Sequence, residues 1–150
     1  MSLVDLIDPH LVVLELEAHD TAEALSILVK RMVEAALLDD EADALRKLVD
    51  REQVMSTGIG GGIAIPHARS PEVDRTVIAV GRSRQGVPFN AVDGAPVKAI
   101  FLILGPPESS AEHVKVLARI ARLVKRPDFL EQMAGAGTET DLLEIIRRMG

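Results

Sequence analysis

Short apolar runs that alternate with amphipathic helical segments constrain the fold of this chain more than any other feature. Residues 97–104 and 76–80 have the length and composition of buried strands, residues 63–65 form a shorter apolar run that ends at a proline, and residues 11–16 predict a first strand. Strands of this length need other elements to cover their apolar faces. The sequence therefore predicts an α/β (α+β) fold: a three-layer α/β/α sandwich with a mixed β-sheet covered by helices on both faces.

Five amphipathic segments predict the helices of the outer layers. They cover residues 21–37, about 40–52, about 110–125, a short stretch after Pro127, and a last stretch after residue 138. The residues expected to cap them are Asp20, Asp39 or Asp40, Ser109 with Glu112 as a capping box, and Thr138 with Asp141. Residues 86–96, which include Gly, Pro and Asn, are expected to form a loop between two strands.

The composition limits the function further. With 150 residues and no linker or repeat, the chain is expected to form one domain over residues 1–150. It has no cysteine, and its four histidines lack metal-ligand spacing, so we expect neither a metal site nor a cofactor. A net charge of −6 and only three aromatic residues argue against nucleic-acid binding. No targeting or membrane segment is visible, so we expect a cytoplasmic protein without membrane insertion.

A glycine-rich segment stands directly before the short 63–65 strand. Gly58, Gly60, Gly61 and Gly62 fall within five residues, which is typical of a tight turn or of close backbone approach to a ligand. The backbone N–H groups of such a loop can hold an anion such as phosphate. No lysine follows as in a nucleotide P-loop, and the dinucleotide-binding pattern fails at Ile63, so neither nucleotide motif is present.

His67 follows Pro66 at the end of this short strand. An imidazole is substantially neutral at cellular pH, so one ring nitrogen has a lone pair that can attack phosphorus. The phosphoramidate that forms can pass the group on, which suits a carrier. The residues alone leave two interpretations open: a phosphoryl acceptor, or an ordinary loop histidine beside a turn.

His113 is the second candidate. On a helix it shares one face with Leu117, Ile120 and Val124, at the end of the inward-facing stripe. A position in the first turn favours the neutral imidazole, which can donate one hydrogen bond to a phosphoryl oxygen. The alternative is a structural histidine bonded to a backbone carbonyl.

The twelve residues Ser56 to His67, S-T-G-I-G-G-G-I-A-I-P-H, resemble the EIIA domains of the fructose/mannitol class of the bacterial phosphoenolpyruvate-dependent phosphotransferase system (PTS). The resemblance covers essentially the whole chain and includes residues 51–52, 93–97 and 113–119. One departure is Ala68, where many relatives have glycine. The family fold is the same three-layer sandwich that the strand and helix pattern predicts.

The resemblance implies that His67 is phosphorylated by the histidine phosphocarrier HPr or its nitrogen-branch relative. It places His113 beside His67, and it implies that Arg51 offsets phosphoryl charge, although an arginine there can simply complement a helix dipole. The remaining candidate phosphate-binding residues are Ser56, Thr57, Gly58, Gly60 and Gly61. Of these, Ser56 and Thr57 can alternatively just initiate the turn.

Three functional branches stay open. Residues 7–14 resemble the nitrogen-regulatory type of EIIA, which signals through its phosphorylation state by binding regulatory target proteins. The alternative is a sugar-specific EIIA for fructose or mannitol that passes the phosphoryl group to an EIIB. A third is a binding module of the same fold that is not phosphorylated. A basic stripe on the His113 helix can help to dock an acidic partner; its members are Lys115, Arg119, Arg122 and Arg126.

Overall fold

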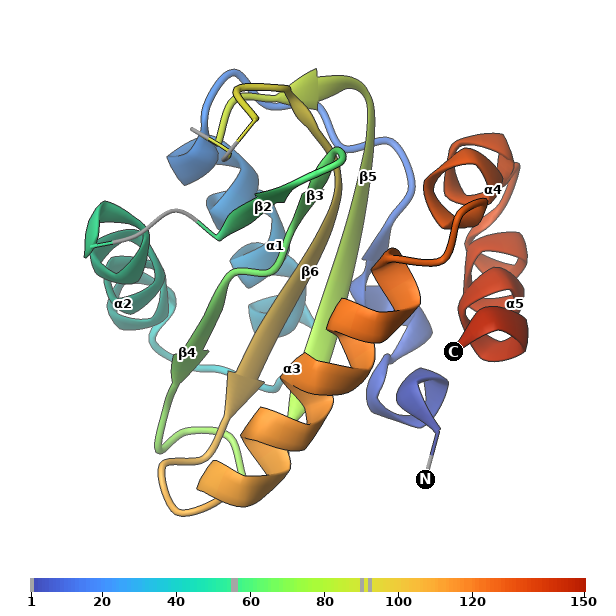
Figure 1. The fold of residues 1–150 in the computed structure, drawn as a ribbon. Helices are drawn as coiled ribbons and strands as arrows, with labels where there is room; N and C mark the ends of the chain where they lie inside the picture. Colours follow the sequence, from blue (N-terminus) through green and yellow to red (C-terminus); the bar gives the residue numbers. More distant parts are fainter. Residues whose placement is uncertain (1, 55–56, 90, 92) are drawn as a thin grey trace.

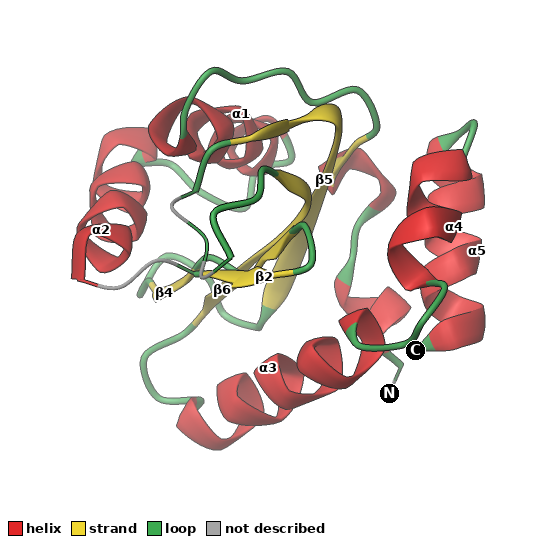
Figure 2. Cartoon of the chain, turned by 45° about the horizontal axis from the view of Figure 1, so that its top comes forward, coloured by secondary structure: helices red, strands yellow, loops and turns green. Residues whose placement is uncertain are grey.

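The computed structural model describes residues 2–54, 57–89, 91 and 93–150. Along the chain its elements are the 3-10 helices η1 (Leu3–Leu6) and η2 (Pro9–Leu11), then β1 (Val12–Val13), α1 (Thr21–Glu34), α2 (Glu41–Val54), β2 (Gly58–Gly60), β3 (Ile63–Ala64), β4 (His67–Arg69), β5 (Val77–Val87), β6 (Val97–Gly105), α3 (Ser110–Val124), α4 (Phe129–Gly135) and α5 (Glu139–Met149). Figure 1 and Figure 2 show α1 and α2 on one side of the sheet and α3, α4 and α5 on the other. This arrangement confirms the predicted three-layer sandwich. Within the described part of the chain, no helix combines the length and apolar character needed to cross a membrane.

The central strand of the sheet is β6. On one side it pairs with β5 in antiparallel orientation, and on the other it pairs with β3 and β4 in parallel orientation. The strand β1 runs parallel to β5 and β2 runs antiparallel to β3, so the order is β1-β5-β6-β3-β2. The sheet is therefore mixed, as predicted.

The strands β3 and β4 are two parts of one line of pairing along β6. They keep the same register, because Ile63 pairs with Ala99 and His67 pairs with Ile103. The interruption falls at Pro66, which has no N–H to donate. Its carbonyl still accepts a hydrogen bond from the Ile103 N–H at 2.9 Å. The register therefore passes through the break and fixes where His67 lies.

Alternation along β5 and β6 divides the core in two. Phe101 and Ile103 belong to the apolar cluster shared with α3, α4 and α5, whereas Leu102 and Leu104 belong to the cluster shared with α1 and α2. All four side chains are at most 1% exposed. Both faces of β6 are buried, which explains its almost unbroken apolar sequence.

The predicted helix caps are largely confirmed. The side chains of Asp20, Asp40 and Thr138 accept hydrogen bonds of 2.8–3.0 Å from backbone N–H groups three residues later. Ser109 stands before α3, but its side chain makes no capping hydrogen bond, so the predicted box with Glu112 is wrong.

The first strand, predicted over residues 11–16, covers only Val12–Val13 as β1, because Leu11 belongs to η2. Two further strand predictions need correction. The strand predicted to end at residue 80 continues as β5 to Val87, so the following loop is shorter than the predicted 86–96. The glycine segment predicted as a loop contains β2, which pairs with β3 as a hairpin. Both strands contain polar residues or glycines, which are uncommon in strands, and they form because of partners elsewhere in the chain. Their sequences alone therefore did not predict them.

Arg82 is the largest exception to the apolar core. It is 2% exposed and lies on β5 two residues after Val80, so it projects toward α4. Its guanidinium donates to the carbonyls of Met133 at 3.0 Å and Ala136 at the C-terminal end of α4, and to Leu14 at 3.2 Å. Its only carboxylate partner within the described residues is Glu15, at 3.1 Å. Arg82 thus satisfies carbonyls that a helix end leaves without donors and joins α4 to the sheet.

We expect Arg82→Ala to lower the free energy of unfolding by about 3 kcal/mol, because it leaves several buried carbonyls without donors. Urea denaturation measures the change. Arg84→Ala is the matched control, since Arg84 also pairs with Glu15 but is 58% exposed at its side chain, and we expect a loss under about 1 kcal/mol. Equal losses in the two variants would show that Arg82 does not anchor α4.

Candidate functional site

His67 begins β4 at the edge of the sheet, and its side chain is half-buried. Its Nδ1 lies 2.8 Å from the carbonyl oxygen of Ile65. A carbonyl oxygen can only accept a hydrogen bond, so Nδ1 carries the proton and donates it. The lone pair of the neutral ring is therefore on Nε2.

His113 lies in the first turn of α3 and is 5% exposed. The centres of its ring and of the His67 ring are 5.6 Å apart, with 56° between the ring planes. Burial, followed by the positive charge of Arg69 and by His67, lowers the pKa of His113 from 6.5 to about 4. His113 is therefore neutral near pH 7.

A pocket of about 500 Å³ joins the two histidines to α2. Its lining includes His67 and Arg69 from β4, His113 and Leu117 from α3, and Arg51 from α2. Figure 1 shows why these elements can meet, because β4 lies at the sheet edge between α2 and α3. The structure thus brings the predicted residues His67, His113 and Arg51 together around one opening.

Arg51 is exposed and reaches this pocket from the C-terminal part of α2. No carboxylate of the described residues forms an ion pair with it, although Asp50 lines the same pocket. A permanent cation in this position can interact with an anion that enters the pocket.

Arg69 is a site residue that the sequence reasoning missed. It follows His67 by two residues on β4, so both side chains project from the same face of the strand. Its guanidinium donates to the Pro107 carbonyl at 2.9 Å and to Ser110 Oγ at 3.3 Å, which holds it beside the start of α3. If a strand had been predicted after Pro66, Arg69 would have been expected beside His67, because side chains two residues apart on a strand share one face.

The glycine turn is not brought to His67. Gly60, Gly61 and Gly62 have φ values of 92°, 65° and 81° and form the turn between β2 and β3. Ile63 directly follows this turn and pairs with β6 four positions before His67, which is roughly 13 Å along a strand. The Gly61 N–H already donates to Asp93 Oδ2 at 3.0 Å. The anion held by this turn is therefore a carboxylate of the chain itself, and the geometry does not place Gly60 or Gly61 against a phosphoryl group on His67.

Thr57 and Gly58 lie closer to the site than the turn does. The Thr57 carbonyl accepts the Ile65 N–H at 3.1 Å, and Gly58 pairs with Ala64. Both the N–H and the hydroxyl of Thr57 donate to the Glu52 carboxylate. These donors therefore hold the end of α2 against β2 rather than pointing freely at His67. Ser56 lies outside the described residues.

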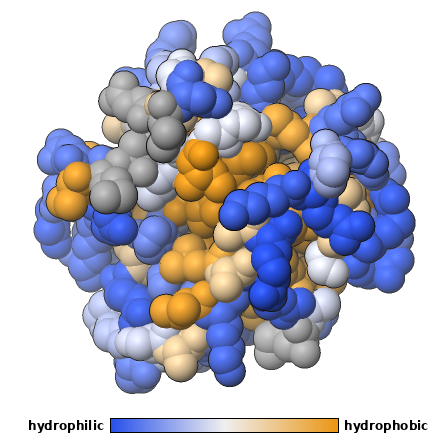
Figure 3. All heavy atoms as spheres, viewed as in Figure 1, coloured by the Kyte–Doolittle hydropathy of each residue, from blue (hydrophilic) through white to orange (hydrophobic). Residues whose placement is uncertain are grey.

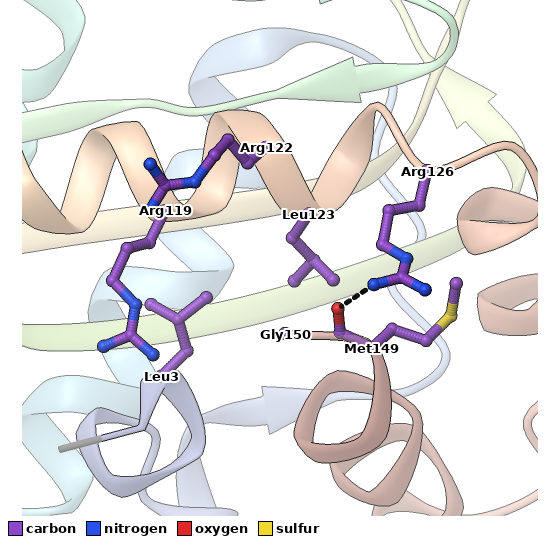
Figure 4. Close-up of a pocket in the computed structure, with 7 residues that line it drawn as sticks. All are labelled: Leu3, Arg119, Arg122, Leu123, Arg126, Met149 and Gly150. Atoms are coloured by element: carbon purple, nitrogen blue, oxygen red, sulfur yellow. Dashed lines mark hydrogen bonds between the residues drawn. The ribbon is translucent and has the colours of Figure 1, made fainter.

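Three arginines of the predicted basic stripe line a separate pocket of about 300 Å³ between α3, η1 and the end of α5 (Figure 4). Arg126 donates to the Met149 carbonyl at 3.1 Å. It therefore supports the C-terminal end of α5, where a cation is favourable. The residues that line this pocket include no histidine, and the pocket begins about 9 Å along α3 from His113.

Apolar side chains gather in the middle of the face that Figure 1 presents, with hydrophilic side chains around them (Figure 3). Among the described residues, the large apolar side chains left exposed are Val54, Ile59 and Val114. Val54 follows Arg51 by three residues, and Val114 directly follows His113. None of the three is among the residues that line the His67 pocket, although Val54 and Val114 are close in sequence to Arg51 and His113, which are.

Comparisons with known proteins agree with this arrangement. Residues 5–149 match the family model described as "Phosphoenolpyruvate-dependent sugar phosphotransferase system, EIIA 2". The "PTS system fructose-specific EIIABC component" of Bacillus subtilis is 31% identical over 148 residues, which are 99% of this chain but only 23% of that protein. The "Nitrogen regulatory protein" of Bradyrhizobium diazoefficiens is 32% identical over 133 residues, 89% of this chain and 86% of the relative.

Solved structures show the same fold. The nitrogen regulatory protein IIA-Ntr from Neisseria meningitidis has a TM-score of 0.89 and 28% identity, covering 96% of this chain and 98% of its own. The mannitol IIA of Escherichia coli has a TM-score of 0.79 at 19% identity, covering 93% and 97%, and shares the fold. On the family match and these relatives, the chain belongs to the EIIA 2 family of the phosphoenolpyruvate-dependent sugar phosphotransferase system.

Proposed function

We propose that this chain is a phosphocarrier that accepts a phosphoryl group on Nε2 of His67 from an HPr-type donor and passes it to a protein partner. The observation that carries the proposal is the hydrogen bond from His67 Nδ1 to the Ile65 carbonyl. It leaves the Nε2 lone pair as the nucleophile in a half-buried ring that lines an open pocket. During transfer, the bond between phosphorus and the donor histidine breaks as the bond to Nε2 forms.

The surroundings of His67 suit a transition state whose negative charge is spread over three oxygens. Arg51 and Arg69 supply permanent positive charge at the pocket. His113 is neutral, so it can offer one N–H without repelling the cations or losing a proton to the substrate. Val54 and Val114 are exposed apolar side chains close in sequence to the lining residues Arg51 and His113, and they support docking of a protein partner.

The regulatory branch is the one we propose for the downstream step. It is supported by relatives named nitrogen regulatory protein and by the TM-score of 0.89 to IIA-Ntr. The alternative is a sugar-specific EIIA, supported by relatives named fructose-specific at similar identity. Transfer from the phosphorylated chain to purified fructose and mannitol EIIB proteins separates the two. Rapid transfer to either EIIB would contradict the regulatory assignment.

We expect His67→Ala to abolish phosphorylation by a mixture of phosphoenolpyruvate, enzyme I and HPr while leaving the fold intact. Mass spectrometry under non-acidic conditions detects the acid-labile adduct and its position. His19→Ala is the matched control, because the His19 side chain is 94% exposed and distant in sequence, and it should be labelled like the parent protein. Full labelling of His67→Ala would refute the proposal.

Arg69→Gln should slow the labelling of His67 about tenfold, because it removes a positive charge beside the transferred group. The initial rate with phosphorylated HPr is the measurement. Ser110→Ala removes one Arg69 hydrogen bond but keeps the charge, so it should change the rate little. If both variants react equally slowly, Arg69 acts by holding the connection between β6 and α3 and not through its charge.

The neutrality of His113 predicts a specific pH dependence of stability. Unfolded His113 binds a proton below about pH 6.5, whereas folded His113 binds it only near pH 4, so acidification between these values favours unfolding. We expect this histidine to contribute a loss of about 2–3 kcal/mol between pH 7 and pH 4. Urea unfolding of the parent and of His113→Gln measures it, since carboxylate contributions are common to both. Parallel curves for the two proteins would contradict a buried, neutral His113.

A further inference from the structure

Two buried polar atoms near the site lack hydrogen-bond partners among the described residues. They are Nδ1 of His113 and Oγ1 of Thr76. Thr76 is fully buried and His113 is 5% exposed, so water does not readily satisfy either atom. An unpaired buried donor or acceptor costs about 1–3 kcal/mol, which makes two such atoms near one another an unusual combination.

His113 Nδ1 and Thr76 Oγ1 both face Gly105, which has no side chain. A Cβ built on Gly105 would lie 3.1 Å from His113 Nδ1 and 3.4 Å from Thr76 Oγ1. Thr76 directly precedes β5, whose Val77 pairs with Leu104 in antiparallel register, so Thr76 stands beside Gly105. Both atoms border the space that the missing side chain of Gly105 leaves, but they are not hydrogen-bonded to each other in the structure. A change in side-chain torsion is needed to bring the hydroxyl to the imidazole nitrogen.

The donor and acceptor count selects one arrangement. A hydroxyl has one hydrogen to donate, and a neutral imidazole has one N–H and one lone pair. If His113 Nδ1–H donated to Thr76, the threonine hydrogen would still lack an acceptor. If the Thr76 hydroxyl donates to the Nδ1 lone pair, both buried atoms are satisfied, and the ring proton resides on Nε2.

We propose that Thr76 is a positioning residue whose hydroxyl donates a hydrogen bond to Nδ1 of His113 and holds this ring as the Nε2–H tautomer. The consequence for transfer rests on the proposed function. With Nε2–H fixed, the ring that lies 5.6 Å from His67 presents a donor to phosphoryl oxygens. The other tautomer would present a lone pair, which repels them.

Histidine ring ¹⁵N NMR near pH 7 tests the tautomer directly and requires no phosphotransfer. Signals of His113 are assigned by their loss in His113→Gln. The parent protein should show Nε2 protonated and Nδ1 bare. Thr76→Ser keeps the hydroxyl and should keep this pattern, whereas Thr76→Val, which has nearly the same shape, should give a mixture or the opposite tautomer. A protonated Nδ1 in the parent protein overturns the inference whether or not Thr76→Val folds.

Kinetics then test whether Thr76 acts through His113. Thr76→Val should slow the labelling of His67 by phosphorylated HPr about fivefold, and Thr76→Ser should restore most of the rate. In a His113→Gln background, Thr76→Val should have no further effect, since the residue through which it acts is absent. Independent, additive effects overturn the inference. If His67 is not labelled in any variant, the proposed function fails, while the NMR result still decides the tautomer.

Discussion

The pairing of β3 and β4 with β6 determines where everything at the site lies. Both faces of β6 are buried, so its position in the molecule is fixed, and the constant register through Pro66 transfers this position to His67. From Gly105, at the end of β6, the chain needs only residues 106–109 to reach α3. The first turn of α3, which carries His113, therefore lies at the same end of the sheet as β4. One register and one short connection are enough to place two histidines from distant parts of the sequence side by side.

The features that were predicted correctly from the sequence are those that depend on residues close to one another in the chain. The caps at Asp20, Asp40 and Thr138 depend on residues three positions apart, and His67 stands in a contiguous motif. The features that were missed depend on distant partners. Arg82 lies beyond the strand predicted to end at residue 80, and its burial depends on carbonyls that α4 supplies. Gly61 was predicted to bind phosphate, but its N–H donates to Asp93. Arg69 was missed for a related reason, because β4 exists only through its pairing with β6.

Burial removes water from a charged group, and this cost explains why the most buried group of the site is a neutral histidine while the two arginines are less buried. Burial lowers the pKa of His113 to about 4, so the deepest group of the site is an uncharged hydrogen-bond donor. Arg51 remains exposed and Arg69 half-buried, where a guanidinium keeps part of its hydration. A charged group in the place of His113 would lose its hydration, and no carboxylate of the described residues forms an ion pair at this position to compensate. The same burial that keeps His113 neutral makes the fold sensitive to acid.

In the function that we propose, the two histidines perform opposite tasks because their Nδ1 atoms have opposite partners. At His67 the partner is the Ile65 carbonyl, an obligate acceptor, so Nδ1 keeps the proton and Nε2 is a nucleophile. At His113 the partner that we infer is a hydroxyl whose hydrogen has no other acceptor, so Nδ1 gives up the proton and Nε2 becomes a donor. Neither assignment needs a charged residue or a shift in the intrinsic chemistry of imidazole. In this proposal, a carbonyl and a hydroxyl, each placed by the β-sheet, are sufficient to make one ring attack phosphorus and the other bind its oxygens.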